Sequence, residues 1–338
     1  MEPAVQTWNF NGGSPRIFPE VQKEFLEVIP HFFHQDCGLL EARQRYEVPE
    51  IVESCLGNIR KYLKIPSDFA VWFNMGGCYQ NTHQIGYNMT SSEDAVINVL
   101  ETGHWARLIG KRLATSNKIN TVNATQEDPL YTTLEPSSQW KIDEEAELFF
   151  YVENDTSSGF NVKHPFDDYM PPGIVIDQCS TLLHGEFDYS EIAYSFATVR
   201  KTCGLTSTLT LNILSDEYKD KPKRSDLHIL DDWTHDIDTM KGKAADILPI
   251  VYTDLTIKHL MKTTSLADTE AQQKAKAARY YEAVDNSDGF YCNPIDPKHR
   301  SFTAHLLQVG DKSPEMKELF VKEAIERNIV MMCGYPHA

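Results

Sequence analysis

The sequence predicts an α/β protein in which helices wrap a mainly parallel β-sheet, with a small α+β domain at the C-terminal end. Short apolar runs, rich in β-branched residues and bounded by turn residues, predict buried strands. Segments with helical spacing alternate with these runs through the first 200 residues, which is typical of a parallel sheet. The predicted strands cover residues 69–73, 95–100, 147–152, 173–176, 192–197 and 205–214.

The composition narrows the class of protein. The chain has 338 residues, of which 41% are hydrophobic, enough for a substantial core and for two domains or one large domain with an appendage. Its formal charge of −17 argues against non-specific nucleic-acid binding and against anionic membranes. No apolar run reaches the roughly 18–20 residues of a membrane span. Seven scattered cysteines without a CxxC pair, and an N-terminus unlike a secretory signal, predict a cytoplasmic protein with free thiols.

Two amphipathic helices are predicted before the first strand, at residues 19–28 and 50–63. The stretch between them contains an HxxH motif with an acid and a thiol beside it, a combination that can hold a metal. The residues are His31, His34, Asp36 and Cys37. No second cluster with ligand spacing accompanies them, so no metal site is predicted.

The strand at 69–73 runs into Gly76-Gly77 and then a predicted helix. A strand, a glycine turn and a helix N-terminus present free backbone N–H groups, which can cradle an anion. A plain tight turn explains the two glycines equally well.

The later strands end in polar loops. Residues 95–100 are followed by Thr-Gly-His-Trp at 102–105 and a helix beyond it, and residues 147–152 by the polar run 154–159. After residue 214 the chain becomes strongly charged. A helical region at 247–286, a strand at 301–309 and a helix at 314–328 complete the predicted elements.

An acid and an amine follow two neighbouring predicted strands. Asp177 ends the run at 173–176, and Lys201 follows the run at 192–197. Ligands of α/β sheets commonly bind where such strand ends meet. Pyridoxal phosphate needs this pair, a Lys for the Schiff base and an Asp on its pyridinium nitrogen. The alternative is that Asp177 caps a loop and Lys201 is a solvated surface charge.

Several stretches resemble the phosphoserine aminotransferase family, class V aminotransferases of the aspartate-aminotransferase-like fold (fold type I). The similarity extends along nearly the whole chain, and the intervals between Trp105, Thr156, Asp177 and Lys201 match the family's spacing. The stretches that carry it are NFNGGSPRIFPEVQKEF, YLKIPSDFAVWFNMGG, TGHW, NDTSSG, VRKTCG and DNSDGFYCNPIDPKHRS.

The resemblance implies a role for each of these positions. Lys201 would hold pyridoxal phosphate as the internal aldimine and transfer the proton of the 1,3-shift. Asp177 would keep the pyridine nitrogen protonated, Trp105 would stack on the ring, and Thr156 would bond its oxygen. The phosphate would lie in the cradle at Gly77, Cys78 and Tyr79.

Two departures affect the cofactor phosphate. The family donates an Asn-Thr pair from a second subunit, and this chain has Asp246-Ile247 there. Arg200 replaces the family's Gln beside the Schiff-base Lys. We hypothesise that Arg200 supplies the compensating charge; the alternative is a salt bridge elsewhere.

Two further departures affect the substrate. The family's His-Arg pair aligns with Arg43-Gln44, and Arg45 follows, so Arg43 and Arg45 are the predicted substrate-binding residues. The family ends with Gly-His-Arg and a carboxylate-binding Arg, where this chain reads CGYPHA at 333–338. Either the chain is cropped there or the usual carboxylate clamp is missing.

The resemblance predicts a homodimeric phosphoserine:2-oxoglutarate aminotransferase of serine biosynthesis, with active sites shared between subunits and amino-acid and oxo-acid substrates. The expected organisation is an N-terminal segment, 1–17, packing with the small domain, a cofactor-binding large domain, 18–265, and a small domain, 266–338. The departures leave two alternatives: a diverged transaminase or lyase with another substrate, or a catalytically impaired homologue that acts as a binding protein.

Overall fold

A computed structural model gives the structure of the chain, and it describes residues 7–10, 13, 15–31, 38–43, 46–122, 131–167, 170–239 and 246–332. Within these ranges, no helix combines the length and apolarity that a membrane span requires.

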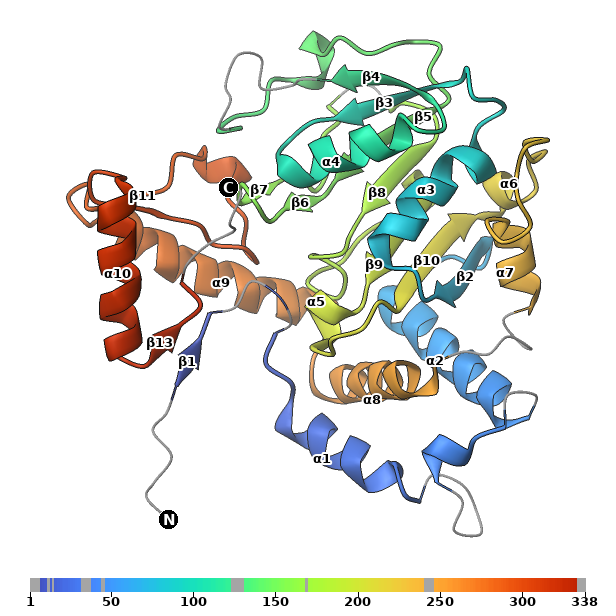
Figure 1. Cartoon of the computed structure of the whole chain (residues 1–338), viewed down its shortest axis with the longest axis horizontal. Helices are drawn as coiled ribbons and strands as arrows, with labels where there is room; N and C mark the ends of the chain where they lie inside the picture. Colours follow the sequence, from blue (N-terminus) through green and yellow to red (C-terminus); the bar gives the residue numbers. More distant parts are fainter. Residues whose placement is uncertain are drawn as a thin grey trace.

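A seven-stranded sheet forms the centre of the molecule, in the order β2-β10-β9-β8-β5-β3-β4 (Figure 1). Strand β10 runs antiparallel to both its neighbours, and the other adjacent pairs are parallel. The predicted mainly parallel sheet is therefore confirmed. Its strands are β2 Phe69–Asn74, β3 Val96–Leu100, β4 Lys118–Val122, β5 Leu148–Val152, β8 Ile174–Asp177, β9 Tyr194–Thr198 and β10 Thr210–Ser215.

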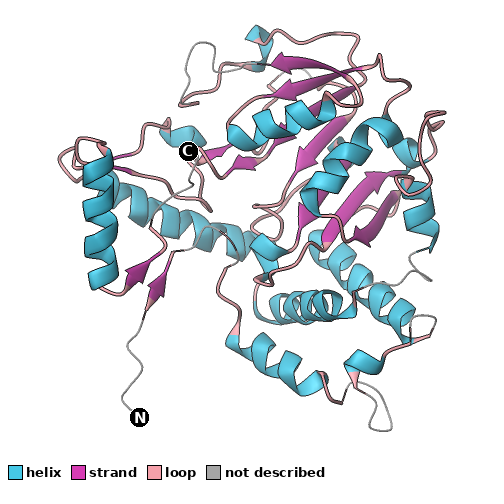
Figure 2. Ribbon diagram, in the orientation of Figure 1, coloured by secondary structure: helices cyan, strands magenta, loops and turns pink. Residues whose placement is uncertain are grey.

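Helices cover both faces of this sheet (Figure 2). One face packs on α3 Gly77–Met89, α4 His104–Leu113 and α7 Trp233–Thr239, and the other on α2 Glu47–Leu63 and α8 Ile247–Thr263. Alternate side chains of a strand point to opposite faces, so Phe149 joins one core and Phe150 the other. Strands buried on both faces read as continuous apolar runs, which is why the sequence identified six of the seven. The partly exposed strand β4 was not predicted.

The small domain lies at the end of the long helix α9 Leu266–Asp285 (Figure 1). It contains a hairpin of β11 Tyr291–Cys292 and β12 Gln308–Val309, and the helix α10 Pro314–Glu326. Strand β1 Trp8–Asn9 pairs in parallel with β13 Ile329–Val330, so two segments from opposite ends of the chain lie side by side. Helix α1 Pro19–Val28 then follows on the large-domain side. The domain limits expected from the sequence stay predictions.

Short elements connect these layers. They are β6 Asn154–Asp155, β7 Phe160–Asn161, α5 Arg200–Cys203, α6 Asp216–Lys219 and the 3₁₀ turns Leu39–Glu41, Ser137–Gln139, Tyr189–Glu191 and Pro297–His299. Two of them matter for function. Strand β6 lies in the connection that follows β5, and α5 carries the Arg and Lys that follow β9.

The strand predicted at 205–214 begins only at Thr210. The backbone before it bonds outside the ladder, because the carbonyl of Thr208 accepts the N–H of Gly77 at 3.1 Å. The strand predicted at 301–309 is reduced to β12, because the Ser301 hydroxyl accepts the N–H groups of Thr303 and Ala304 and closes a turn.

The helical region predicted at 247–286 is two helices, α8 and α9. The break lies at Thr264-Ser265, where both residues are extended. Ser265 caps α9, since its hydroxyl accepts the N–H of Asp268 at 3.1 Å. Two helix ends also differ from expectation: α2 begins at Glu47 and α10 ends at Glu326.

Gly173 gives a test of how strand β8 is placed. Its φ is +61°, and a Cβ there would lie 2.4 Å from the carbonyl oxygen of Glu147. We expect Gly173→Ala to lower the free energy of unfolding by about 1–3 kcal/mol, measured by urea denaturation. Gly57→Ala on α2 is the control, because its Cβ meets nothing within 4 Å and should raise stability by up to about 1 kcal/mol. Equal effects of the two substitutions would contradict this account.

Candidate active site

The four residues singled out for a cofactor ring come together at one edge of the sheet. Asp177 ends β8, and Thr156, Lys201 and Trp105 follow β6, β9 and β3 respectively. The Lys201 Nζ donates to the Thr156 Oγ1 at 3.4 Å and lies 5.5 Å from the centroid of the Trp105 ring. Parallel strands end at the same edge, so residues far apart in sequence meet there.

Asp177 is a carboxylate held away from water, with 7% of its surface exposed. Burial raises its pKa; the Cys179 N–H, which bonds Oδ1 at 2.8 Å, and the Lys201 ammonium oppose that rise. Its backbone is fixed as well, because its carbonyl accepts the N–H of Glu153 at 3.1 Å. A buried carboxylate of this kind favours a cationic partner.

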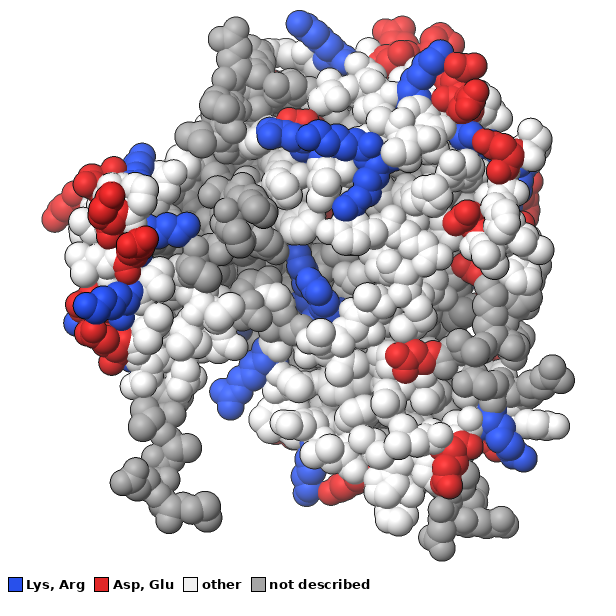
Figure 3. Space-filling model, in the orientation of Figure 1, with Lys and Arg blue, Asp and Glu red and all other residues white. Residues whose placement is uncertain are grey.

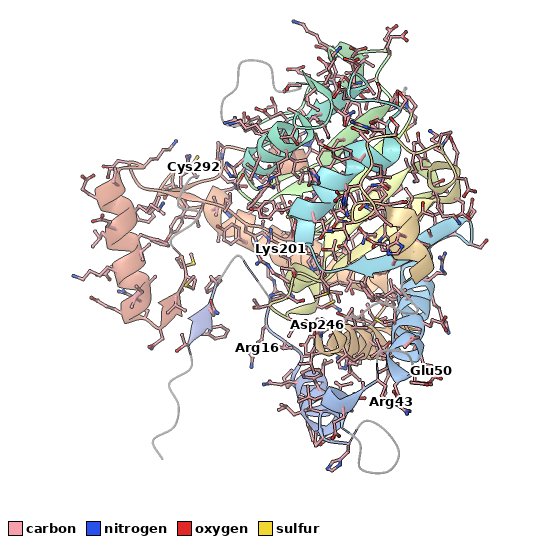
Figure 4. The ribbon with its side chains drawn as sticks, turned by 45° about the vertical axis from the view of Figure 1, so that its right-hand side comes forward. Arg16, Arg43, Glu50, Lys201, Asp246 and Cys292 are labelled. Carbon is pink, nitrogen blue, oxygen red and sulfur yellow. The ribbon has the colours of Figure 1, made fainter. Side chains whose placement is uncertain are left out.

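Lys201 is placed by the single helical turn α5, which begins directly after β9. Gly204 ends the turn with φ +88°, and a Cβ at that position would lie 3.2 Å from the carbonyl oxygen of Pro15. The N-terminal segment therefore packs against the turn that carries the lysine. Figure 4 shows Lys201 in the middle of the molecule, with Arg16 and Asp246 below it in that view.

Asp155 joins two of the loops, and sequence reasoning missed it. Its Oδ2 accepts the N–H groups of Trp105 at 2.9 Å and Ala106 at 3.2 Å, which caps helix α4. Gly103 is required beside it, since a Cβ there would lie 2.4 Å from the Asp155 carboxyl carbon. The sequence shows an acid next to Thr156, but its hydrogen-bond partner Trp105 lies 50 residues earlier in the chain, so no local pattern connects the two.

A second buried carboxylate, Glu153, supports the Asp177 loop and was also missed. Its Oε2 accepts the Gln178 amide at 2.8 Å and the Thr181 hydroxyl at 2.7 Å. The oxygen of the same Gln178 amide accepts from Ser195 at 2.7 Å. This network ties the residues that follow β5 and β8 to Ser195 of β9.

The glycine turn after β2 opens helix α3 at the same edge. Gly77 has φ +67°, and Cys78 and Tyr79 form the first turn of the helix. The exposed Tyr79 ring lies under the Arg112 guanidinium, whose carbon is 3.5 Å from the ring centroid. Arg112 thus adds a cation near the cradle that the sequence did not indicate.

The residues expected to bind anions farther out lie at different distances from Lys201. Arg200 is exposed, and within the described residues no hydrogen bond or ion pair of its side chain is found, so the alternative of a salt bridge elsewhere receives no support. Arg43 pairs with Glu47 through several contacts, including one of 2.9 Å, and Figure 4 shows it far from Lys201. Asp246 is exposed at the start of α8. Arg45, Gln44 and residues 333–338 lie outside the described residues.

Charge is distributed unevenly over the face that Figure 3 shows. Lys and Arg side chains lie across its middle, while Asp and Glu gather toward its edges. Among the described residues no group of three or more His, Cys, Asp and Glu side chains could hold a metal. His34, Asp36 and Cys37 of the HxxH stretch are outside those residues.

Comparison with known proteins supports the resemblance along the whole chain. No family model matches. The chain is 27% identical over 334 residues to a probable phosphoserine aminotransferase of Dictyostelium discoideum, covering 97% of this chain and 88% of that protein. It is 25% identical to the phosphoserine aminotransferase of Chromobacterium violaceum, covering 98% and 90%.

Solved structures with low sequence identity share the fold. A pyridoxal-phosphate-bound phosphoserine aminotransferase from Trichomonas vaginalis superposes with a TM-score of 0.89 at 21% identity, covering 98% of this chain and 93% of that one. The phosphoserine aminotransferase of Bacillus circulans subsp. alkalophilus gives 0.88, covering 98% and 91%. The predicted aspartate-aminotransferase-like fold and the predicted resemblance are confirmed.

Glu153 gives the site a characteristic pH dependence. Burial raises its pKa above the ordinary value of 4.5, so the folded chain holds a proton that the unfolded chain releases. The free energy of unfolding should therefore fall as pH rises from 4.5 through the folded pKa, by at most about 1.4 kcal/mol per pH unit. We expect Glu153→Gln to remove this slope, measured by urea unfolding at several pH values.

Asp188 provides the control of opposite sign for that measurement. The Ser190 hydroxyl, 2.6 Å from it, lowers the pKa of Asp188, so its contribution is present above the unfolded pKa and is lost as pH falls. Asp188→Asn should change the slope only at acid pH and in the other direction. If the difference between wild type and Glu153→Gln did not vary with pH, the burial argument would be wrong.

Proposed function

We propose that this chain is a pyridoxal-phosphate-dependent aminotransferase that transfers the amino group of glutamate to 3-phosphohydroxypyruvate, giving phosphoserine and 2-oxoglutarate on the route to serine. The observation that carries this is the meeting of Asp177, Lys201, Thr156 and Trp105 at one sheet edge. The curated relatives named as phosphoserine aminotransferases, matched along nearly their whole length, support the substrate.

The residues present fit the cofactor. A buried carboxylate with one backbone N–H on Oδ1 suits a protonated pyridine nitrogen, and an amine beside a hydroxyl and an indole face suits a lysine attachment point. The first turn of α3 at Cys78 and Tyr79 suits a phosphate, because its N–H groups lie at a helix N-terminus. When bound, the cofactor supplies an electron sink for the charge that develops at the substrate Cα.

Each residue of the site would then have a separate role. Lys201 would hold the cofactor and, once displaced by the substrate amine, accept and return the Cα proton. Asp177 would hold the ring nitrogen in its charged form, and Trp105 and Thr156 would fix the ring's plane and tilt. Asp155 acts through Trp105, because it fixes the start of α4.

The substrate anion would need a second subunit. Arg43 lies far from Lys201 within one chain, so it could act only in a partner's site, as expected of a homodimer with shared sites. Arg43 is already bonded to Glu47, and the substrate phosphate would have to compete with that carboxylate. We place the protein in the cytoplasm, because all five described cysteines are free thiols.

Lys201→Ala tests the central assignment. The purified protein should show the visible absorbance of a lysine-bound cofactor, and Lys201→Ala should lose that band together with at least about 100-fold in transamination rate. Lys262→Ala, an exposed lysine at the end of α8, is the control and should keep both.

The amino donors then separate the rival functions. Phosphoserine and glutamate should each discharge the absorbance band at low concentration, whereas serine should not. Discharge by an unrelated amino acid alone would point to a diverged transaminase or lyase. A colourless protein that takes up no added cofactor would point to a binding role and would overturn the proposal.

Arg200 is expected to contact the cofactor phosphate, because it is exposed beside Lys201 at the same edge. Removing one charge-assisted hydrogen bond costs about 1.5–3 kcal/mol, so Arg200→Ala should weaken cofactor affinity about 10- to 100-fold. Reconstitution of the apo-protein, followed by absorbance, gives the dissociation constant. Arg327→Ala on α10 should leave it unchanged, and an unchanged value for Arg200→Ala would contradict the role.

A further inference from the structure

Two thiols meet at the base of the site, and the proposed reaction uses neither side chain. Cys78 is the second residue of helix α3, and Cys179 follows Asp177 by two positions. The two side chains are hydrogen-bonded to each other and belong to the same packed cluster. They join the phosphate cradle to the loop that carries Asp177.

Thr198, at the end of β9, lies beside both segments. Its N–H donates to the Cys179 Sγ at 3.3 Å. Its methyl group lies next to Gly77, since a Cβ built on that glycine would be 3.9 Å from it. The Cys179 thiol also hydrogen-bonds the buried Asp177 carboxylate. A negative charge on Cys179 would lie next to that carboxylate, so a thiolate is favoured on Cys78 rather than on Cys179.

The two thiols consequently differ in reactivity. Cys78 is partly exposed, and the hydrogen bond from Cys179 lowers its pKa, with the charges of Arg112 and Lys201 acting the same way against burial and Asp177. Its place in the first turn of a 13-residue helix acts in the same direction. Cys179 is buried, and the contact with Cys78 together with burial raises its pKa. A reactive thiolate beside a protected thiol is the arrangement of redox-active cysteine pairs.

We propose that Cys78 and Cys179 form a redox-active pair that a hydroperoxide oxidises to a disulfide. The Cys78 thiolate attacks the terminal peroxide oxygen, the O–O bond breaks, and the product alcohol or water leaves with a proton. The resulting Cys78 sulfenic acid is attacked by the Cys179 sulfur, which forms the S–S bond and releases water. Each sulfur loses one electron in total, and the two electrons reduce the peroxide.

Other cysteines of the chain provide controls for this pair. Cys55 and Cys203 are also neighbours, but both are buried, and burial raises the pKa of Cys203 to about 12. Cys292 is partly exposed in the small domain, away from Lys201 (Figure 4). Cys203 is thus a buried control whose pKa is raised, and Cys292 is a partly exposed control away from the pair.

Oxidation would also affect the cofactor, a consequence that rests on the proposed function. A disulfide would pull the first turn of α3 toward the Asp177 loop and change the direction of the Cys78 N–H. The phosphate cradle would be distorted, so the oxidised chain should bind pyridoxal phosphate more weakly. Bound cofactor should in turn slow oxidation, because it would cover the exposed side of Cys78.

The test is peptide mapping of the full chain after treatment with hydrogen peroxide. The intact mass should fall by two hydrogen atoms, and the cross-linked peptide should join Cys78 to Cys179. The Cys78 thiol should react faster than that of Cys292, because a lowered pKa raises the thiolate fraction of Cys78. Cys179→Ser should abolish the cross-link and leave Cys78 trapped by a sulfenic-acid reagent, and Cys203→Ser should change neither result.

Absence of the Cys78–Cys179 peptide from the oxidised wild-type chain would overturn the proposal, as would a cross-link through Cys292 or Cys55. This measurement needs no cofactor, so it stands or falls separately from the proposed aminotransferase activity. A second arm compares oxidation rates with and without pyridoxal phosphate. Equal rates, with the disulfide still formed, would leave the pair intact and remove only its link to the cofactor.

Discussion

The burial of the central sheet on both faces is the constraint from which the site follows. In strands packed between two layers of helices, charged side chains lie at the strand ends. Asp177, Lys201 and Thr156 all occupy such ends, and they share one edge because their strands are parallel. The sheet that supplies most of the core thus also decides where charged chemistry can be placed.

The acids at that edge are maintained by specific neighbours. Glu153 receives two side-chain hydrogen bonds, Asp155 receives backbone N–H groups of helix α4, and Asp177 lies within the field of Lys201. Each partner comes from another strand or loop, so the three carboxylates also hold the loops together. A polar network that is satisfied in this way rigidifies the surroundings of a bound ring.

The chain differs from the pattern of the phosphoserine aminotransferases that it resembles at the phosphate and substrate anchors, and the structure describes only some of these positions. Arg112 lies over Tyr79 close to the cradle, and Arg200 is exposed beside Lys201, so cations remain near the phosphate position. Arg43 is engaged by Glu47 and distant from Lys201 in its own chain. In the proposed function the cofactor would therefore be held by residues of one subunit, while substrate binding would require a second.

The sequence by itself predicted the sheet and its main strands, because strands buried on both faces read as continuous apolar runs. It also placed Asp177 and Lys201 after two of these strands, and the family resemblance added Trp105 and Thr156. Only the tertiary structure decided what lies between those residues. The capping of α4 by Asp155, the Glu153 network and the contact of Cys78 with Cys179 join segments tens of residues apart, and no local pattern encodes such pairings. The break between α8 and α9 and the late start of β10 escaped prediction for a related reason: hydrogen bonds to particular partners overrode local propensity.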